Sequence, residues 1–361
     1  MAAGEKALAV AKLQQQKIIE QLQEWVLRQL HDLGVGGEDE RLGSWSPLGG
    51  DAGFRRYFRF CNSARNTSLL AVWAPPATEK NREFVQIARF LKSQGLATPE
   101  VFAFDIDNGF LLLEDLGEQL LLDRLNSETA DTLYVRAVAV LNTLQKCPIH
   151  QIPLPRYDAA ELQREMALFC EWFVPQLLGY KMSETELSLI HRFFMQLQNS
   201  ALQQPQVIVH RDYHSRNLIY RESQPFGVID FQDALVGPIS YDLVSLLRDC
   251  YIAWPQTRVE GWLKNYFALA IGDGLLPQAT TFEDFEQWFD WMGLQRHIKV
   301  LGIFSRLWLR DGKQAYLNDL PLVIHYVRSV AARYPDLSEF IAWFDSALWP
   351  LILQQPWMRH D

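Results

Sequence analysis

The spacing of hydrophobic residues changes near residue 120 of this 361-residue chain. Before that point, short apolar runs are separated by turn residues, a pattern typical of strands. The expected strands lie at 54–61, 68–73, 101–104 and 110–113. One helical stretch, at about 79–93, lies between them, and helical spacing at about 12–33 precedes them. This part of the chain predicts an antiparallel sheet with one main helix.

Helical periodicity dominates from about residue 127 onwards. Asp158 opens one helix, and Ser183 with Glu186 forms a capping-box sequence before the next. Further helices are expected at about 240–253, 258–271, 282–310, 320–333 and 338–353. The pattern therefore predicts an α+β fold with two lobes. Its parts are an N-terminal helical segment (1–44), a nucleotide-binding N-lobe (45–116) and a mostly helical C-lobe with the catalytic loop and substrate pocket (117–361), with a candidate hinge at 114–117.

Three short apolar runs, at 207–209, 218–220 and 227–229, interrupt the helical region and predict buried strands joined by polar loops. The residues His210, Arg211, Asp212 and Asn217 between the first two runs satisfy the kinase catalytic-loop pattern H-R-D-x-x-x-x-N. Asp230 and Phe231 follow the third run, where a kinase has D-F-G, although Gln232 replaces the glycine. The pattern favours phosphoryl transfer.

Phosphoryl transfer from ATP requires correctly oriented oxygen atoms rather than covalent catalysis. We expect Asp212 to act as the general base, or at least to aim the substrate hydroxyl. Asn217 and Asp230 offer oxygen ligands for a hard cation, which indicates Mg²⁺. Asp233 is a second metal or substrate ligand, or a turn residue. Asp242 lies in the first turn of an apolar helix, where it suits the helix dipole and could brace the catalytic loop.

The nucleotide site is less clearly marked. Glu83 lies where a kinase has the glutamate that pairs with a strand lysine, yet the strand at 68–73 contains no lysine. Arg55, Arg56 or Lys80 could supply that positive charge, and we favour Arg56 because one of two successive strand residues must face inward. The expected nucleotide contacts are Gly49, Gly50, Arg56, Glu83, Glu114 and Leu116.

Composition restricts the range of possible functions less than the motifs do. The net charge of −9 gives no reason to expect a nucleic-acid or anionic-membrane partner. No window approaches ~18 uninterrupted apolar residues, so no membrane span is expected. The four cysteines form no C-x-x-C pair and the first residues lack the apolar core of a signal peptide, which favours the cytoplasm. The pattern specifies no oligomeric state.

Taken together, His210–Asn217, Asp230-Phe231, the preceding sheet lobe and the helical tail resemble the aminoglycoside phosphotransferase/choline kinase superfamily. The resemblance covers roughly residues 45–330 and implies a protein-kinase-like fold, with ATP and Mg²⁺ as cofactors. The strings at 50–59, 74–76, 111–117, 229–234 and 295–304 more closely resemble the bacterial kinases of N-acetylmuramate and N-acetylglucosamine. That likeness implies phosphorylation of the anomeric hydroxyl of an amino sugar in cell-wall recycling.

A lactyl carboxylate on such a sugar would favour a cationic partner, above all a planar arginine. The candidates are Arg248, Arg296, Lys299 and Arg306. A choline, homoserine or aminoglycoside kinase remains the alternative enzyme, although the basic residues at 295–310 argue against a cationic substrate. A pseudokinase that lost catalysis with its lysine is a third reading. A protein kinase is excluded because too few residues separate Asp230 from Ser240 for an activation loop.

Overall fold

The computed structural model describes residues 2–32, 43–49, 54–62 and 67–358, with side chains from residue 13 onwards except that of Thr67. The chain divides into two compact units. The sheet unit comprises Met1–Gln119 and Ile219–Asp233, and the helical unit comprises Leu120–Leu218 and Ala234–Asp361. The expected α+β, two-lobed fold is confirmed. The segment 219–233, however, returns to the sheet unit instead of continuing the C-lobe expected from residue 117.

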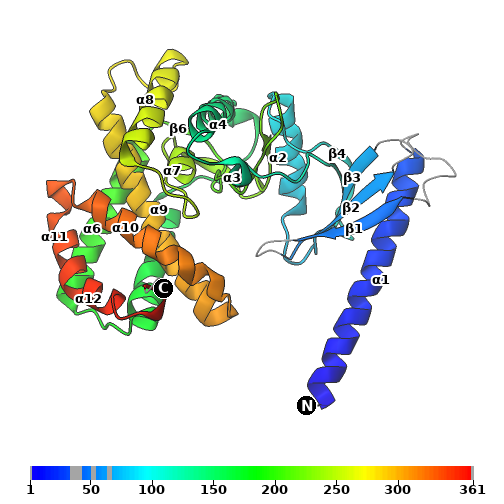
Figure 1. The fold of residues 1–361 in the computed structure, drawn as a ribbon, viewed down its shortest axis with the longest axis horizontal. Coiled ribbons are helices and arrows are strands. Elements are labelled where there is room, and N and C mark those ends of the chain that lie inside the picture. The colour runs from blue at the N-terminus through cyan, green and yellow to red at the C-terminus, as the bar shows by residue number, and fades with distance from the viewer. Residues whose placement is uncertain (1, 33–42, 50–53, 63–66, 359–361) are drawn as a thin grey trace. The chain divides into compact units, whose positions relative to one another are not determined.

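The sheet unit contains a sheet of five antiparallel strands in the order β1-β2-β3-β5-β4, of which β1 to β4 are labelled in Figure 1. Their bounds are Ser44–Leu48 (β1), Arg56–Asn62 (β2), Thr67–Trp73 (β3), Val101–Asp105 (β4) and Phe110–Glu114 (β5). The helix α2 spans Asn81–Ser93, close to its expected position. Strand β1 was not predicted, because its sequence, Ser-Trp-Ser-Pro-Leu, contains too few β-formers to stand out.

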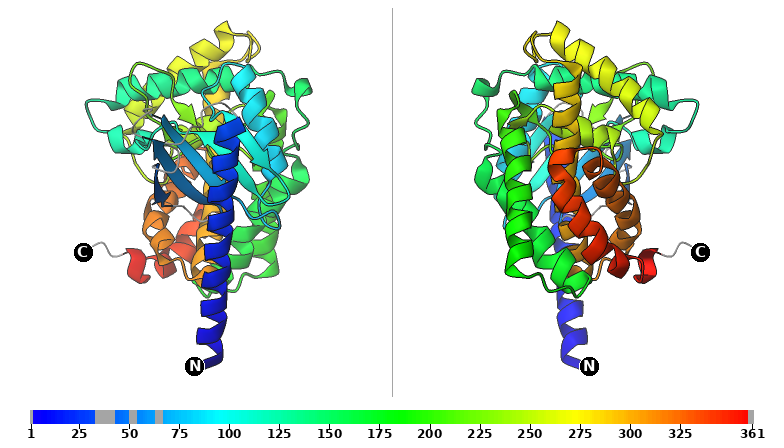
Figure 2. Two further views of the ribbon diagram at one scale, coloured as in Figure 1. Left: turned by 90° about the vertical axis from the view of Figure 1, so that its right-hand side faces the viewer. Right: turned by 90° about the vertical axis from the view of Figure 1, so that its left-hand side faces the viewer.

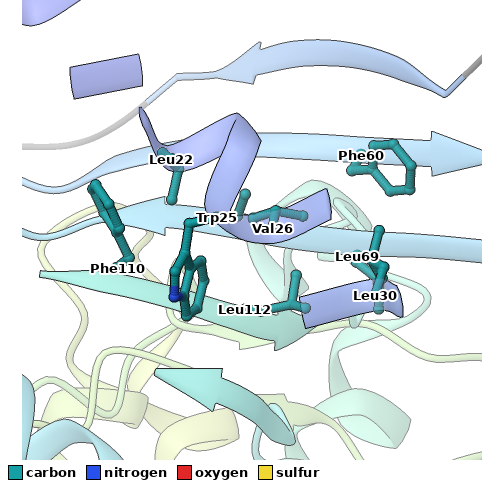
Figure 3. Close-up of a cluster of buried hydrophobic side chains, with 9 residues drawn as sticks. Leu22, Trp25, Val26, Leu30, Phe60, Leu69, Phe110 and Leu112 are labelled. Carbon is teal, nitrogen blue, oxygen red and sulfur yellow. The ribbon is translucent and has the colours of Figure 1, made fainter. Parts of the chain in front are cut away.

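Helix α1, Ala2–Asp32, lies along one face of the sheet in both views (Figures 1 and 2). Its stripe residues Leu22, Trp25 and Val26 pack against strand residues such as Phe60 and Leu112, forming a buried cluster (Figure 3). Burial of this stripe is what holds a long, otherwise polar helix on the sheet. The N-terminal helical segment expected at 1–44 thus contributes its helix, Ala2–Asp32, to the core of the sheet unit.

The helical unit is built around α9, Phe282–Asp311, which contacts α5, α6, α7 and α10; several of these helices are visible in Figure 2. The helices have these bounds: α3 Leu121–Arg124, α4 Ala130–Gln145, α5 Ala159–Leu168, α6 Glu184–Gln203, α7 Tyr241–Leu247, α8 Gln256–Gly272, α10 Leu320–Ala331, α11 Ser338–Trp343 and α12 Trp349–Ile352. A Cβ atom on Gly302 would lie 2.4 Å from the carbonyl carbon of Leu168, so only glycine allows α9 to approach α5 this closely.

The helix starts follow the caps read from the sequence. The side chain of Asp158 accepts a 2.9 Å hydrogen bond from the backbone N–H of Glu161, and Ser183 and Glu186 form the expected capping box at the start of α6. The helix expected to continue beyond α5 instead widens into a π-helical stretch, Phe169–Leu177, which contains Pro175. None of the helices in the described ranges combines the length and apolar character needed to cross a membrane.

The three short apolar runs form strands as predicted. Strand β6, Gln206–Val209, pairs antiparallel with β9, Leu235–Pro238, while β7, Leu218–Ile219, pairs with β8, Gly227–Val228. Within the sheet unit, the N–H of Val228 donates to the carbonyl of Ala97 at 2.9 Å, which attaches the 219–233 segment to the loop before β4. His210 and Asn217 therefore adjoin strand ends, and Asp212 and Asp230 lie two or three residues after a strand.

Candidate active site

The loop that follows β6 is held by a buried carboxylate beneath it. Asp242, in the first turn of α7, accepts hydrogen bonds from the backbone N–H groups of His210 (2.6 Å) and Arg211 (3.0 Å). Burial raises the pKa of Asp242 to about 6, against the opposing effect of His210. Arg211 has a positive φ of 78°, a conformation that costs a non-glycine residue about 1–3 kcal/mol unless its surroundings enforce it. Asp242 therefore braces the loop, as one reading of the sequence expected.

The side chain of Arg211 forms an ion pair with Glu165, a buried residue of α5. Lys299 of α9 pairs with the same carboxylate at 2.8 Å, and the hydroxyl of Tyr157 donates to it. Burial tends to raise the pKa of Glu165, but Lys299 and Arg211 hold it at about 2. Two cations from different elements thus share one buried anion, which fixes the loop from a second side.

A third contact to the loop comes from Arg296, a predicted substrate residue. Its guanidinium donates to the backbone carbonyl of Arg211 at 2.9 Å and to the hydroxyl of Ser245 at 2.7 Å, and it lies 4.4 Å from the ring centroid of Tyr241. Both terminal nitrogens are therefore engaged in holding the loop. Arg296 lines the cavity described below, but its described bonds are those of a positioning residue.

Asp212 and Asn217 lie within this braced loop. The side-chain amide of Asn217 donates to the backbone carbonyl of Asp212 at 2.9 Å, which orients its amide oxygen the opposite way. Partial burial tends to raise the pKa of Asp212, but His214, Lys299 and Arg296 together lower it below its ordinary value. Asp212 is therefore ionised at neutral pH and able to accept a proton or a hydroxyl hydrogen bond.

A cavity of about 140 Å³ opens beside Asp212 within the helical unit. It is smaller than the ~300–1,000 Å³ typical of small-molecule pockets, so it would hold part of a ligand. Its lining residues are Asp212, His214, Ser245, Arg248, Asp249, Cys250, Tyr251, Arg296, His297, Lys299, Val300, Ile303 and Phe304. The predicted Arg248 and Arg296 are both present, whereas Arg306, one turn beyond Ile303 on α9, is absent from the lining.

Three buried nitrogen atoms on this cavity lack a hydrogen-bond partner among the described residues: Nδ1 of His214, Nδ1 of His297 and Nη1 of Arg248. Arg248 is only 4% exposed, and its other terminal nitrogen pairs with Asp290 at 2.6 Å. Burial and the neighbouring Arg248 lower the pKa of His297 to about 3, so this imidazole is neutral. Because buried polar atoms are normally satisfied, three unpartnered ones on one cavity indicate a place for a polar ligand.

In the sheet unit, Asp230 follows β8 with a positive φ of 65°. The side-chain amide of Gln232, the residue that replaces the expected glycine, donates to the Asp230 carboxylate at 2.8 Å. Phe231 stacks on Phe84 of α2, with 5.0 Å between ring centroids. Asp233, a predicted substrate or metal residue, forms an exposed ion pair with Lys80 at 2.6 Å.

The predicted nucleotide contacts of the sheet unit are less uniform. The buried member of the arginine pair is Arg55, which is 6% exposed, while Arg56 is exposed. This orientation corrects the reasoning that favoured Arg56. Glu83 is also exposed, on the first turn of α2, and Glu114 ends β5 in an ion pair with Lys92 at 2.8 Å.

The remaining nucleotide candidates lie in loops. Gly49 follows β1, whereas Gly50 lies outside the described residues. Leu116 lies after β5, and its side chain packs so close to Gly227 that a Cβ atom there would approach it to 2.9 Å. These positions stay predictions.

The chemistry of the motif side chains suits a hard cation. Asn217 presents a carboxamide oxygen and Asp230 a carboxylate, the ligand types that Mg²⁺ takes from proteins. Across the described ranges, no group of three or more His, Cys, Asp and Glu side chains could hold a metal ion. Mg²⁺ in kinases takes one or two protein oxygens together with substrate phosphates, so the oxygen that each residue offers within its own unit is of a suitable type for that ion.

Sequence reasoning missed one residue that holds the loop, Glu165, and two buried residues that contact the cavity residue Arg248, Asp290 and His297. Glu165 lies within the apolar stripe of α5, and Asp290 and His297 lie within a nearly continuous buried stretch of α9. A charged or titratable residue on the buried face of a helix is a detectable signal, because such residues are rarely buried without a partner. Asp242 was recognised by its place in the first turn of an apolar helix, whereas the burial rule would have found the other three.

Residues 44–279 match the model of the phosphotransferase enzyme family. The chain is 43% identical to an N-acetylmuramate/N-acetylglucosamine kinase of Pseudomonas putida, over 89% of this chain and 94% of that one. It is 44% identical to a protein of the same name from Pseudomonas aeruginosa, over 81% and 85% of the two chains. Its fold is similar to that of a choline/ethanolamine kinase family protein from Mesorhizobium loti, with a TM-score of 0.59, 12% identity and coverage of 83% and 92%.

These findings confirm the resemblance stated from the catalytic-loop motif and the sheet-plus-helix pattern. The match begins after α1 and spans the five strands of the sheet, the braced loop and the helices up to α8, and the relative from Pseudomonas putida aligns over 89% of this chain. The chain belongs to the phosphotransferase enzyme family.

Proposed function

We propose that this protein is an ATP- and Mg²⁺-dependent kinase that phosphorylates the anomeric hydroxyl of N-acetylmuramate and N-acetylglucosamine. The observation that carries the proposal is the cavity beside Asp212, with its ionised carboxylate and its three unpartnered nitrogens. The names of the curated relatives support the choice of an amino sugar. Such a kinase would act in cell-wall recycling and in the cytoplasm, where ATP is supplied.

In the proposed reaction, Asp212 accepts the hydrogen of the anomeric hydroxyl and directs its oxygen at the γ-phosphorus. A new P–O bond forms to the sugar, the bond to the departing ADP breaks, and the hydroxyl proton passes to the carboxylate or to solvent. The loop bonds from Asp242 and Arg296 keep Asp212 in position, which is the main contribution that phosphoryl transfer requires of a protein. We assign Asn217 and Asp230 as oxygen ligands of Mg²⁺, which when bound neutralises phosphate charge.

The polar groups of the cavity support an acidic or neutral sugar. Arg248 presents a buried Nη1 atom without a partner among the described residues, which could donate to a lactyl carboxylate. The imidazoles of His214 and His297 offer hydrogen bonds to hydroxyl or acetamido groups. A cationic substrate such as choline would instead face Arg248, Arg296 and Lys299 along the cavity wall. These charges disfavour the choline- and aminoglycoside-type alternative.

The test is a coupled ADP-release assay with ATP, Mg²⁺ and a panel of amino sugars, amines and aminoglycosides, followed by phosphorus NMR of the product. We expect N-acetylmuramate and N-acetylglucosamine to be phosphorylated on the anomeric oxygen. Asp212→Asn should lower kcat by at least ~100-fold while ADP still binds, since the carboxylate acts on the hydroxyl rather than on the nucleotide.

Asp336→Asn provides a matched control, because Asp336 is an exposed aspartate of the helical unit far along the chain from the loop. It should keep the wild-type rate. A product phosphorylated on the 6-hydroxyl would overturn the anomeric assignment and leave the sugar-kinase proposal in place. An Asp212→Asn variant with wild-type kcat would remove Asp212 from the mechanism.

A further inference from the structure

The strand that would carry a kinase lysine, β3, contains no basic residue, so the sheet unit must meet the phosphates of a nucleotide with a charge from elsewhere. Three cations near the start of the unit were considered from the sequence. Lys80 is 59% exposed and is committed to an ion pair with Asp233. Arg56 is exposed, and its Nη1 donates to the adjacent backbone carbonyl of Arg55 at 3.2 Å. Neither is enclosed in the unit.

Arg55 differs from both because its side chain is enclosed. It is 6% exposed, its Nε atom lies 3.0 Å from the carboxylate of Glu79, and its guanidinium carbon lies 4.9 Å from the ring centroid of Phe84. Its Nη2 atom has no hydrogen-bond partner in the part of the chain that the structure describes. A buried guanidinium nitrogen without a partner is costly, so this atom indicates a missing anionic or polar ligand.

Two aromatic side chains connect Arg55 with the residue next to Asp230. Phe84, under the guanidinium, stacks on Phe231, which is the residue next to Asp230 in the chain. Tyr57 connects the same groups: burial raises its pKa, the Arg55 guanidinium opposes that rise, and the Asp230 carboxylate adds to it. Arg55, with its unpartnered Nη2 atom, and the proposed metal ligand Asp230 therefore belong to one local cluster of the sheet unit.

We infer that Arg55 supplies the positive charge for the nucleotide phosphates that a strand lysine supplies in kinases, and that Glu79 positions it. Glu79 makes two contacts at this point, since its second carboxylate oxygen accepts a hydrogen bond from the backbone N–H of Phe54 at 3.2 Å. It therefore holds both the side chain of Arg55 and the backbone just before it. A planar guanidinium held in this way presents its remaining N–H donors in a fixed direction.

The test measures the ratio of ADP affinity to adenosine affinity, by calorimetric titration of the full chain with Mg²⁺ present. Adenosine reports the integrity of the nucleoside pocket, whereas ADP adds only the phosphates. Arg55→Gln should lower this ratio by about 10- to 100-fold, the range expected for a lost charge-assisted contact, and leave adenosine affinity unchanged. Arg28→Gln, the matched control, should keep the ratio within about twofold of wild type because Arg28 is an exposed arginine of α1 to which no nucleotide contact is assigned.

Arg55→Lys supplies the same measurement if the glutamine variant does not fold. Its point charge replaces the planar fork, so the ratio should fall severalfold. A ratio within twofold of wild type in whichever variant folds would overturn the inference. So would an equal loss of ADP and adenosine affinity, because that result marks a structural role.

The inference rests on the proposed use of ATP, and the experiment separates the two. Wild-type protein that binds ADP no better than adenosine would remove the proposed function and the inference with it. Wild-type protein that favours ADP strongly, with variants that do the same, would overturn the role of Arg55 alone. Sugar phosphorylation is not needed for either result.

Discussion

The two units hold their functional side chains by different means. In the helical unit, the loop that carries Asp212 is bonded to buried polar side chains, among them Asp242, Glu165 and Arg296. In the sheet unit, Arg55 is held by one carboxylate, that of Glu79, and by the aromatic ring of Phe84. The difference follows from the backbone. A loop outside regular structure has N–H and C=O groups that need side-chain partners, whereas a sheet satisfies its own.

The difference should appear first in stability. Glu165→Gln leaves Arg211 and Lys299 without their shared buried anion and should cost about 3–5 kcal/mol of unfolding free energy. Trp25→Ala opens the apolar cluster under α1 and should cost a similar ~3–5 kcal/mol. Urea unfolding at pH 7 measures both. Equal stability of the Glu165 variant and wild type would contradict the polar account of the helical unit.

The pH dependence distinguishes the two losses. The folded-state pKa of Glu165, about 2, lies below its ordinary value because Lys299 and Arg211 outweigh burial. Its stabilisation is therefore present above about pH 4.5 and is lost as the pH falls toward 2. The cost of Glu165→Gln should shrink across this window, while the cost of Trp25→Ala, which involves no titrating group, should not change through the same cause.

A smaller effect is expected from the brace beneath the loop. Asp242→Asn replaces one of the two acceptor oxygens by an amide N–H₂ and should lower kcat by roughly 10- to 100-fold through misplacement of Asp212. Because the pKa of Asp242 is about 6, wild-type kcat should fall as the pH drops below that value and the carboxyl protonates. The variant should lack this decline. A variant with the wild-type pH profile would show that another group titrates.

The same raised pKa has the opposite consequence for stability. A carboxyl whose folded-state pKa is raised stabilises the fold fully at low pH, and that contribution is lost as the pH rises through about 6. Wild type should therefore lose stability relative to Asp242→Asn between about pH 4 and pH 6. Thermal unfolding of both proteins across this range measures the trend. This trend would show that the ionised form of Asp242, which holds the loop, lowers the stability of the fold.

The smallest expected effect lies far from either cluster. Ser183→Ala removes the side-chain half of the capping box at α6 and should cost about 1 kcal/mol. Ser183→Asp, which keeps an N-cap acceptor, should restore most of it, as measured by urea unfolding at neutral pH. A loss equal to that of Glu165→Gln would show that exposed caps and buried ion pairs contribute alike.

Local patterns predicted most of the fold. The strands at 207–209, 218–220 and 227–229, the caps at Asp158 and Ser183 and the long helix α9 depend on periodicity and turn chemistry, which are readable in a single sequence. The strand β1 and the π-helical stretch Phe169–Leu177 were missed, since neither follows a strong local preference.

The choice between Arg55 and Arg56 shows where local reasoning ends. Alternation along a strand correctly implied that one of the two faces inward. Which one depends on α1, because its apolar stripe packs against the face of the sheet that presents Phe58 and Phe60. Arg56, at the start of β2, lies on the same face of the strand as Phe58 and Phe60. Arg55, one residue earlier, lies on the opposite face, with Tyr57. That information lies about 30 residues away in the sequence.

The return of residues 219–233 to the sheet unit has a consequence for biosynthesis. Ala97 receives its partner Val228 only after some 130 further residues have been translated, and the stretch Leu120–Leu218 among them belongs to the other unit. The amino-terminal portion emerging from a ribosome is therefore unfinished, with the edge beside Leu116 uncovered. A fragment that ends at Gln119 would lack residues 219–233, which belong to the sheet unit. Truncation at the end of the first continuous segment therefore does not isolate that unit.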